Sequence, residues 1–145
     1  MSLMLTLFVL ATAAASTSAL AADSTPHGSV TQTFQVRANG SNSWTIDGQT
    51  NPALVLQRGN TYVFHLNSVG ATHPFNINTM NAPGPNFRYE NGVTNNGATG
   101  TTDITFIVPN DAPATLHYNC ENHVGMNGPI TITAADRIFS NNFDL

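Results

Sequence analysis

Apolar and polar residues alternate along several short runs between positions 31 and 133. In one run, Tyr62, Phe64 and Leu66 fall on one side while Val63 and His65 fall on the other. A period of two is typical of β-strands. Similar runs, separated by Gly, Pro and Asn, lie at 34–36, 44–46, 54–57, 75–77, 104–108, 116–118 and 130–132. Because no convincing helix appears, the pattern predicts an all-β fold, an antiparallel Greek-key β-sandwich of seven to eight strands.

The segments outside this domain have different compositions. Residues 1–22 are interpreted as a signal peptide, because an apolar run and a run of small residues lead to Ala19-Leu20-Ala21, a small-x-small cleavage pattern. The run is too short to span a bilayer well, so the mature chain is expected to have no membrane span and to be exported, periplasmic or secreted. Residues 23–30 form a polar lead-in. Residues 134–145 form a C-terminal tail, interpreted as a packed extension, a sorting tag or a frayed end.

The composition narrows the possible partners. Charged residues make up 8% of the 145 residues, the net charge is -4, and the chain has no lysine. A nucleic-acid or anionic-membrane partner would need a basic patch, and none is present in the sequence. The length allows one domain, and a monomer is expected.

The single cysteine stands in a short run of possible metal ligands. Cys120 is followed by His123 and Met126 in CENHVGM. One cysteine cannot form an internal disulfide, so it pairs with another chain, reacts or binds something. Thiolate, imidazole and thioether form a soft ligand set that selects copper over magnesium or calcium.

A trigonal copper site with a long axial methionine needs a second histidine. His73 follows a loop and precedes the run at 75–77, so it could meet another loop at the same end of a sandwich. His65 lies inside a strand, His117 points to the face opposite Cys120, and His27 lies in the polar lead-in. His73 is therefore the geometric candidate.

Three longer stretches resemble the cupredoxins, the small blue copper proteins. They are PALVLQRGNTYVFHLNS at 52–68, GATHPFNI at 70–77 and VPNDAPATLHYNCENHVGMNGPITI at 108–132. The resemblance covers about residues 31–133, and the Cys-x2-His-x2-Met spacing is similar to that of amicyanin. It implies one copper ion, Cu(II)/Cu(I), bound by His73, Cys120, His123 and Met126. It also implies an electron carrier, not an enzyme, with a redox partner protein whose identity the sequence does not give.

The resemblance implies further details around the site. The edge of His123 would reach solvent through an apolar patch, with Pro74, Met80 and Pro83 as candidate members. In most cupredoxins an Asn follows the first ligand histidine, and the backbone N–H of this Asn donates to the cysteine sulfur. Here the residue after His73 is Pro74, which has no N–H. The N–H of Asn122 is expected to compensate, and Asn76 to tie the two ligand loops together.

Other interpretations stay open. The chain could bind copper without redox function, or be a cupredoxin-shaped surface module without a working metal site, with the Asn-rich loop at 86–102 as its binding surface. Each candidate ligand alone is more often structural. A single cysteine excludes a binuclear centre with two bridging cysteines, and the lack of His-x-His pairs argues against a multicopper oxidase. Trp44 and Tyr118 are interpreted as core residues, and Arg88 is expected to pair with Glu90.

Overall fold

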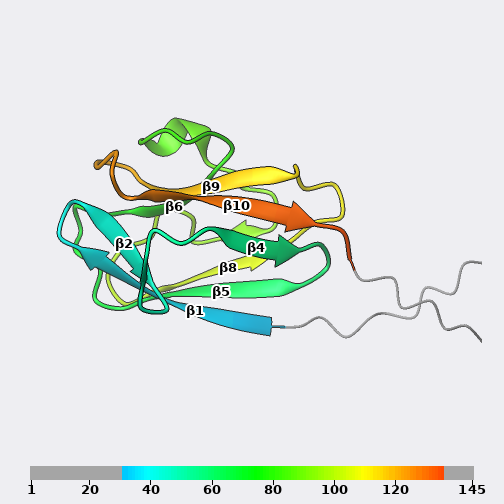
Figure 1. Ribbon diagram of the computed structural model, residues 1–145, viewed down its shortest axis with the longest axis horizontal. Coiled ribbons are helices and arrows are strands. Elements are labelled where there is room, and N and C mark those ends of the chain that lie inside the picture. The colour runs from blue at the N-terminus through cyan, green and yellow to red at the C-terminus, as the bar shows by residue number, and fades with distance from the viewer. Residues whose placement is uncertain (1–30, 136–145) are drawn as a thin grey trace, which may run out of the picture.

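The computed structural model describes residues 31–135, so the expected signal peptide, the lead-in and residues 136–145 lie outside the described part. That part contains ten strands and one 3-10 helix (Figure 1). They are β1 (Thr31–Asn39), β2 (Ser43–Ile46), β3 (Gln49–Thr50), β4 (Leu54–Gln57), β5 (Thr61–Leu66), β6 (Phe75–Asn78), η1 (Pro85–Phe87), β7 (Val93–Thr94), β8 (Asp103–Ile107), β9 (Thr115–Cys120) and β10 (Asn127–Thr133). Every predicted run corresponds to a strand, and the two additional strands, β3 and β7, have only two residues each. Within residues 31–135, no helix is long and apolar enough to cross a membrane.

The strands form two sheets packed face to face (Figure 1). One sheet has the order β3-β2-β1-β5-β8-β7, and the other has the order β4-β10-β9-β6. The all-β sandwich is confirmed, but the prediction that it is wholly antiparallel is wrong: β1 runs parallel to β5, and β10 runs parallel to β4. Alternation along one strand reports which face is buried, and it contains no information on the direction of the neighbouring strand.

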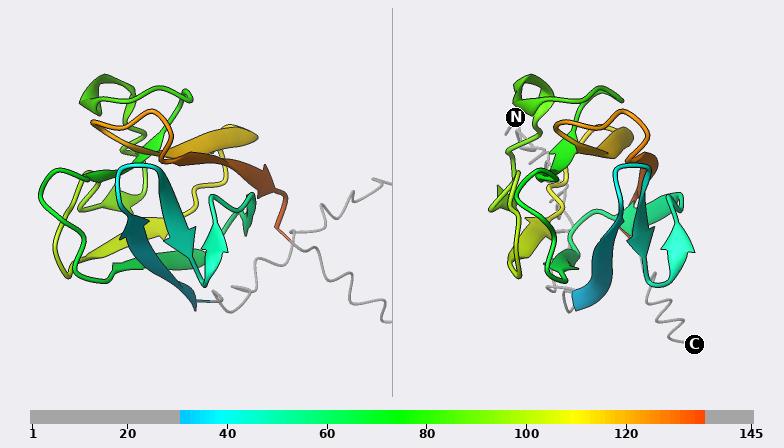
Figure 2. Two further views of the ribbon diagram at one scale, coloured as in Figure 1. Left: turned by 60° about the vertical axis from the view of Figure 1, so that its left-hand side comes forward. Right: turned by 90° about the vertical axis from the view of Figure 1, so that its left-hand side faces the viewer.

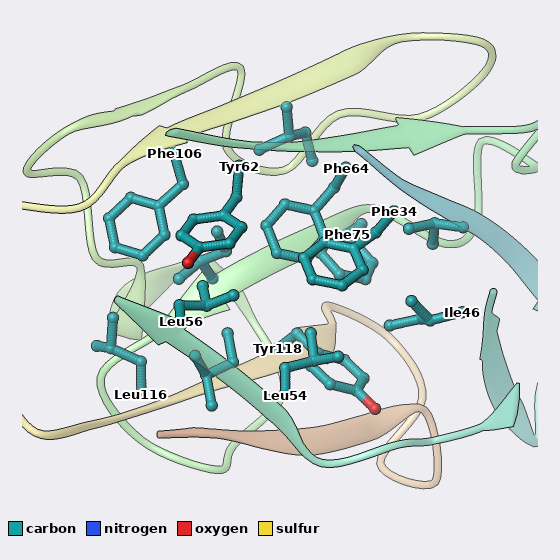
Figure 3. Close-up of a cluster of buried hydrophobic side chains, with 14 of the residues drawn as sticks. Phe34, Ile46, Leu54, Leu56, Tyr62, Phe64, Phe75, Phe106, Leu116 and Tyr118 are labelled. Atoms are coloured by element: carbon teal, nitrogen blue, oxygen red, sulfur yellow. The ribbon is translucent and has the colours of Figure 1, made fainter. Parts of the chain in front are cut away.

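Aromatic side chains fill the space between the sheets (Figure 3). The rings of Phe75 and Tyr118 stack at a centroid separation of 5.7 Å, and the rings of Trp44 and Phe75 form a T-shaped pair with a centroid separation of 4.9 Å. Trp44 and Tyr118 are fully buried, which confirms their assignment to the core. Aromatic pairs of this kind stabilise the fold beyond the area that they bury.

The strand β6 lies at the edge of its sheet and is buried on both faces. Phe75 and Ile77 point into the core as predicted, but Asn76 and Asn78 are also buried. The side chain of Asn78 donates to the carbonyl of Ala82 at 2.9 Å, so the segment after β6 folds back over its outer face. The sequence alternates apolar and polar residues here, yet both faces of β6 are covered. Asparagine can be buried on the outer face because its amide forms hydrogen bonds with the covering loop.

Candidate metal centre

Strand pairing brings the two candidate ligand loops together. Phe75 at the start of β6 pairs with Cys120 at the end of β9. The segment that ends at His73 therefore lies beside the segment that begins after Cys120, although 47 positions separate the two residues. The N–H of His73 donates to the carbonyl of Gly70 at 2.9 Å, which turns the first loop at this end of the sandwich. In the end-on view of Figure 2 (right), the orange loop after β9 lies at this end.

Three of the four predicted ligands form one group. The His73 Nδ1 and His123 Nδ1 atoms lie 3.1 Å apart, and the Cys120 Sγ atom lies 3.9 Å from the first and 3.5 Å from the second. All three atoms fall within 4.8 Å of one another. Nitrogen and sulfur atoms bound about 2.0–2.3 Å from one transition-metal ion have separations of this order. The donor set and its spacing therefore fit a soft or borderline metal ion.

Two histidines that the sequence analysis set aside stay outside this group. His65 lies on β5, and its Nδ1 atom is 2.6 Å from a carboxylate oxygen of Asp103. His117 lies on β9, opposite Asn78 of β6 and Pro129 of β10. The selection of His73 from strand-end position thus agrees with the geometry, within the part of the chain that the structure describes.

Met126, the fourth predicted ligand, is fully buried in the core cluster that also contains Cys120. Its carbonyl accepts hydrogen bonds from the N–H of Cys120 at 2.8 Å and from the Trp44 indole at 3.0 Å. Its own N–H donates to the His123 carbonyl at 3.1 Å. The backbone of the ligand loop is therefore closed on itself and anchored to β2, and the axial role of Met126 stays a prediction.

The neighbouring turn fixes the other side of the ligand loop. The Asn51 side chain donates to the carbonyl of Gly125 at 2.9 Å and accepts from the N–H of Trp44 at 2.8 Å. A Cβ atom at Gly125 would lie 2.7 Å from the carbonyl oxygen of Asn42, so only glycine fits here without movement of the backbone. Sequence reasoning missed Asn51 and Asn42, because neither stands near the ligands in the sequence.

Backbone donors surround the cysteine sulfur. Burial raises the pKa of the Cys120 thiol, while hydrogen bonds from the N–H groups of Asn122 and His123 lower this pKa and the Glu121 carboxylate raises it. The N–H of Asn122, the donor expected in place of the one that Pro74 lacks, therefore lies beside the sulfur. Burial, and then the proximity of His123, lower the pKa of His73, which favours the neutral imidazole that a metal needs.

Asn122, and not the expected Asn76, connects the two ligand loops. The Asn122 side chain donates to the carbonyl of Thr72 at 2.8 Å and so connects the two loops directly. Asn76, the residue expected in this role, donates to Gly84 at 3.4 Å and accepts from Arg88 Nε at 3.1 Å. It lies on the outer face of its sheet, so its amide reaches the covering segment instead.

Arg88 is a neighbour of the site that sequence reasoning assigned to another partner. The expected pairing with Glu90 is wrong, because the Arg88 guanidinium forms an ion pair with Glu121, the residue after Cys120. An isolated antiparallel β-bridge pairs the backbones of Asn78 and Arg88, so the arginine lies beside β6. From there its side chain reaches the loop after β9. The partners are 33 positions apart, and no local pattern in the sequence indicates their contact.

The surface near the ligand loop carries exposed apolar side chains. Of the patch members predicted from the resemblance, Met80 and Pro83 are exposed, while Pro74 is half-buried. Val124, which the sequence analysis did not single out, directly follows His123 and is 76% exposed.

One asparagine of the Asn-rich segment turns its side-chain amide inward. The Asn96 side chain accepts from the N–H of Ile77 at 2.8 Å and donates to the carbonyl of the same residue at 3.1 Å, as a neighbouring strand would. Gly97 and Ala98 continue this pairing by exchanging backbone hydrogen bonds with Phe75. Residues 96–98 therefore close the open edge of β6, and the Asn96 amide is not free to bind a partner.

Known structures share this architecture. The copper protein rusticyanin matches with a TM-score of 0.50 and 20% identity, over 71% of this chain and 78% of that chain. A structure of rusticyanin from Thiobacillus ferrooxidans matches with a TM-score of 0.49 and 21% identity, over 71% and 77%. A multi-copper oxidase from Pseudomonas Thermotolerans matches with a TM-score of 0.49 and 12% identity, over 75% of this chain and 31% of that chain. No family model and no curated protein match the chain. The two-sheet topology and the likeness to rusticyanin show that the chain has the cupredoxin fold.

Proposed function

We propose that this protein binds one copper ion through His73, Cys120, His123 and Met126 and carries single electrons between partner proteins. The observation that supports this most directly is the convergence of two imidazole nitrogens and one buried thiol sulfur within 4.8 Å at one end of the sandwich. A copper ion bound there would supply one-electron Cu(II)/Cu(I) chemistry.

The chain's own residues would hold the ligands in nearly fixed positions. Cys120 is anchored by its N–H bond to Met126, and the N–H groups of Asn122 and His123 lie beside its sulfur. The Asn122–Thr72 hydrogen bond fixes the first ligand loop against the second. Ligands that move little between two oxidation states need little rearrangement when an electron arrives or leaves, which favours fast transfer.

Burial of the cysteine favours a carrier over an enzyme that uses a nucleophilic thiol. Cys120 has no exposed surface, and burial raises its pKa. Reactive catalytic cysteines stand in electropositive and partly exposed positions. An electron, by contrast, can reach a buried ligand set without direct contact between the sulfur and a substrate.

The exported chain would act outside the cytoplasm. The signal peptide at 1–22 would direct it to the periplasm or the exterior, and the mature protein would comprise the lead-in at 23–30, the domain at 31–133 and the tail at 134–145. A lone cysteine is exposed to oxidation in such compartments. Its burial at the end of β9 would protect it there. We expect the protein to act as a monomer with a redox partner protein and without nucleic acid.

The visible spectrum of the copper-loaded protein tests this function. The mature chain is given Cu(II) in slight excess and desalted. We expect an intense absorption band in the red that is lost in Cys120→Ser and kept in His117→Gln, a histidine outside the ligand group. Reversible one-electron voltammetry of the coloured protein then separates an electron carrier from a protein that only binds copper. A colourless protein that retains no copper would contradict the metal site.

A further inference from the structure

The Arg88 side chain is held on three sides. Its guanidinium forms an ion pair with Glu121, and its Nε donates to the Asn76 side chain at 3.1 Å. Gly97 lies directly against the guanidinium, so that no Cβ fits there unless the arginine moves. The side chains of Arg88 and Glu121 are only 28% and 18% exposed. The pair is therefore better ordered and less screened by salt than a typical surface ion pair.

Both partners of Arg88 belong to the segments that carry the candidate ligands. Glu121 directly follows Cys120, and its N–H donates to the carbonyl of Pro74 at 3.2 Å. Asn76 lies on β6, three positions after His73, and pairs with Asn119 of β9. Arg88 thus bridges the strand after the first ligand and the loop after the second, from a third segment that contains no ligand.

Glu121 is also the main fixed charge close to the site. The segments that form this end of the sandwich are 39–42, 51–53, 67–74, 95–102 and 120–126, and Glu121 is the only Asp, Glu, Lys or Arg among their residues. Glu121 directly follows Cys120, so its charge stands one position from the candidate sulfur ligand. Arg88 comes from outside these segments and places one positive charge against this carboxylate.

We propose that Arg88 is a positioning residue that neutralises Glu121 beside Cys120 and thereby sets the reduction potential of the metal site and its affinity for divalent ions. This inference rests on the proposed metal site and extends it to a residue outside the ligand loops. An unbalanced Glu121 carboxylate would stabilise the more positively charged ion, so it would favour Cu(II) over Cu(I) and strengthen the binding of Zn²⁺.

Four variants separate the charge from the shape of Arg88. Arg88→Met removes the positive charge, Glu121→Gln removes the negative charge, and the double variant removes both. Arg88→Lys keeps the charge without the planar fork of the guanidinium. We expect the loss of a single charge beside the site to change the Cu(II)/Cu(I) equilibrium and the Zn²⁺ dissociation constant by about tenfold. For a one-electron couple, a tenfold change corresponds to about 59 mV.

Two measurements follow each variant. The midpoint potential of the copper form should fall in Arg88→Met, rise in Glu121→Gln, and return close to the original value in the double variant and in Arg88→Lys. The Zn²⁺ dissociation constant of the metal-free protein, from competition with a chromophoric chelator, should decrease in Arg88→Met and increase in Glu121→Gln. Arg58→Met is the matched control, because Arg58 follows β4 at the opposite end of the sandwich, beside the end of β10 (Figure 1). Neither quantity should change in it.

The sign of the zinc effect distinguishes charge from structural support. A purely structural role for Arg88 predicts weaker Zn²⁺ binding in Arg88→Met and no recovery in the double variant, and this result would overturn the proposal. An unchanged Zn²⁺ affinity in Glu121→Gln would overturn the proposal too. Because this variant keeps Arg88, it still tests the charge effect if Arg88→Met fails to fold. If the unsubstituted protein shows no red band with copper, the proposed function fails, while the zinc measurements still test the charge effect.

Discussion

The indole N–H of Trp44 donates to the carbonyl oxygen of Met126 at 3.0 Å, across 82 positions of sequence. This contact is buried, and it connects a strand of the larger sheet to the last residue of the candidate ligand loop. Trp44, a residue of the aromatic core, therefore holds the backbone of the loop that carries two of the candidate ligands and Met126.

Trp44→Phe should destabilise both the fold and the metal-bound loop. The Met126 carbonyl would lose one of its two donors, and the smaller ring would leave a cavity, for a combined loss of about 1–3 kcal/mol in the free energy of unfolding. Urea unfolding of the metal-free protein measures this loss. The copper form should release its ion faster to a chelator, and an unchanged release rate would show that the bond does not restrain the ligand loop.

Restoring an N–H group at position 74 should raise the reduction potential. Pro74 has no N–H to donate to the cysteine sulfur, whereas the N–H groups of Asn122 and His123 lie beside it. An additional donor withdraws electron density from the thiolate and so favours Cu(I). Pro74→Asn and Pro74→Ala both restore the N–H, and both should shift the midpoint potential upward by a few tens of mV, where about 59 mV corresponds to a tenfold change. A shift in the asparagine variant alone would assign the effect to its side chain, and no shift in either would refute the donor explanation.

Met126→Leu should separate the packing role of Met126 from its role as a ligand. The substitution nearly conserves apolar volume, so the metal-free protein should lose less than about 1.5 kcal/mol of stability. Loss of a weak thioether donor makes Cu(II) less favourable, and the midpoint potential should rise. Voltammetry and urea unfolding on the same preparation give both values. A loss of stability with no change in potential would make Met126 a core residue only.

Tyr118→Phe should reduce the loss of stability at alkaline pH. Burial raises the pKa of Tyr118, whose hydroxyl donates to the carbonyl of Pro52 at 2.7 Å. Because the pKa is higher in the folded than in the unfolded chain, the stability linked to this proton is complete below about pH 10 and is lost as the pH rises above that value. The variant should cost about 1 kcal/mol near neutral pH. Urea unfolding at about pH 7 and about pH 11 checks both effects, and equal losses in the two proteins would contradict this role for Tyr118.

Asn96→Ala should open the edge of β6. The side chain of Asn96 accepts from the N–H of Ile77 and donates to the Ile77 carbonyl, which also accepts from the N–H of Tyr89. Its removal therefore leaves the Ile77 N–H without this partner, at about 1–3 kcal/mol. Asn91→Ala is the matched control, because Asn91 lies in the same segment, is exposed, and reaches Asp111 only at a long 3.5 Å. We expect the control to change the free energy of unfolding by less than about 0.5 kcal/mol. Equal effects would mean that the Asn96 bonds contribute little.

The strands were predictable because their information is local. The alternation from Tyr62 to Leu66 matches the observed burial of β5 residue by residue, since period two belongs to a single strand. The parallel partner of β5 was not predictable, because no residue of β1 encodes the direction of a strand 30 positions away. Covered edges such as β6 are equally hidden, because burial of Asn76 and Asn78 depends on where a distant loop lies.

The candidate site divides in the same way. Cys120 and His123 stand on one short loop, and the position of His73 before a strand placed it at the same end of the sandwich. The residues that support these ligands come from elsewhere: Asn51 follows β3, and Arg88 follows η1. Their roles depend on side chains that cross between segments, and such contacts leave no pattern in the sequence.

The parallel pairing of β4 with β10 has a consequence for the order in which the protein assembles. Ile130 aligns with Leu54, so β4 joins its sheet only through the last strand of the domain. A chain emerging from the ribosome cannot complete this sheet, or close the ligand loop that precedes β10, until almost the whole domain has been synthesised. Contacts between such distant positions slow folding. Metal uptake would therefore come late in folding, after β10 has paired with β4.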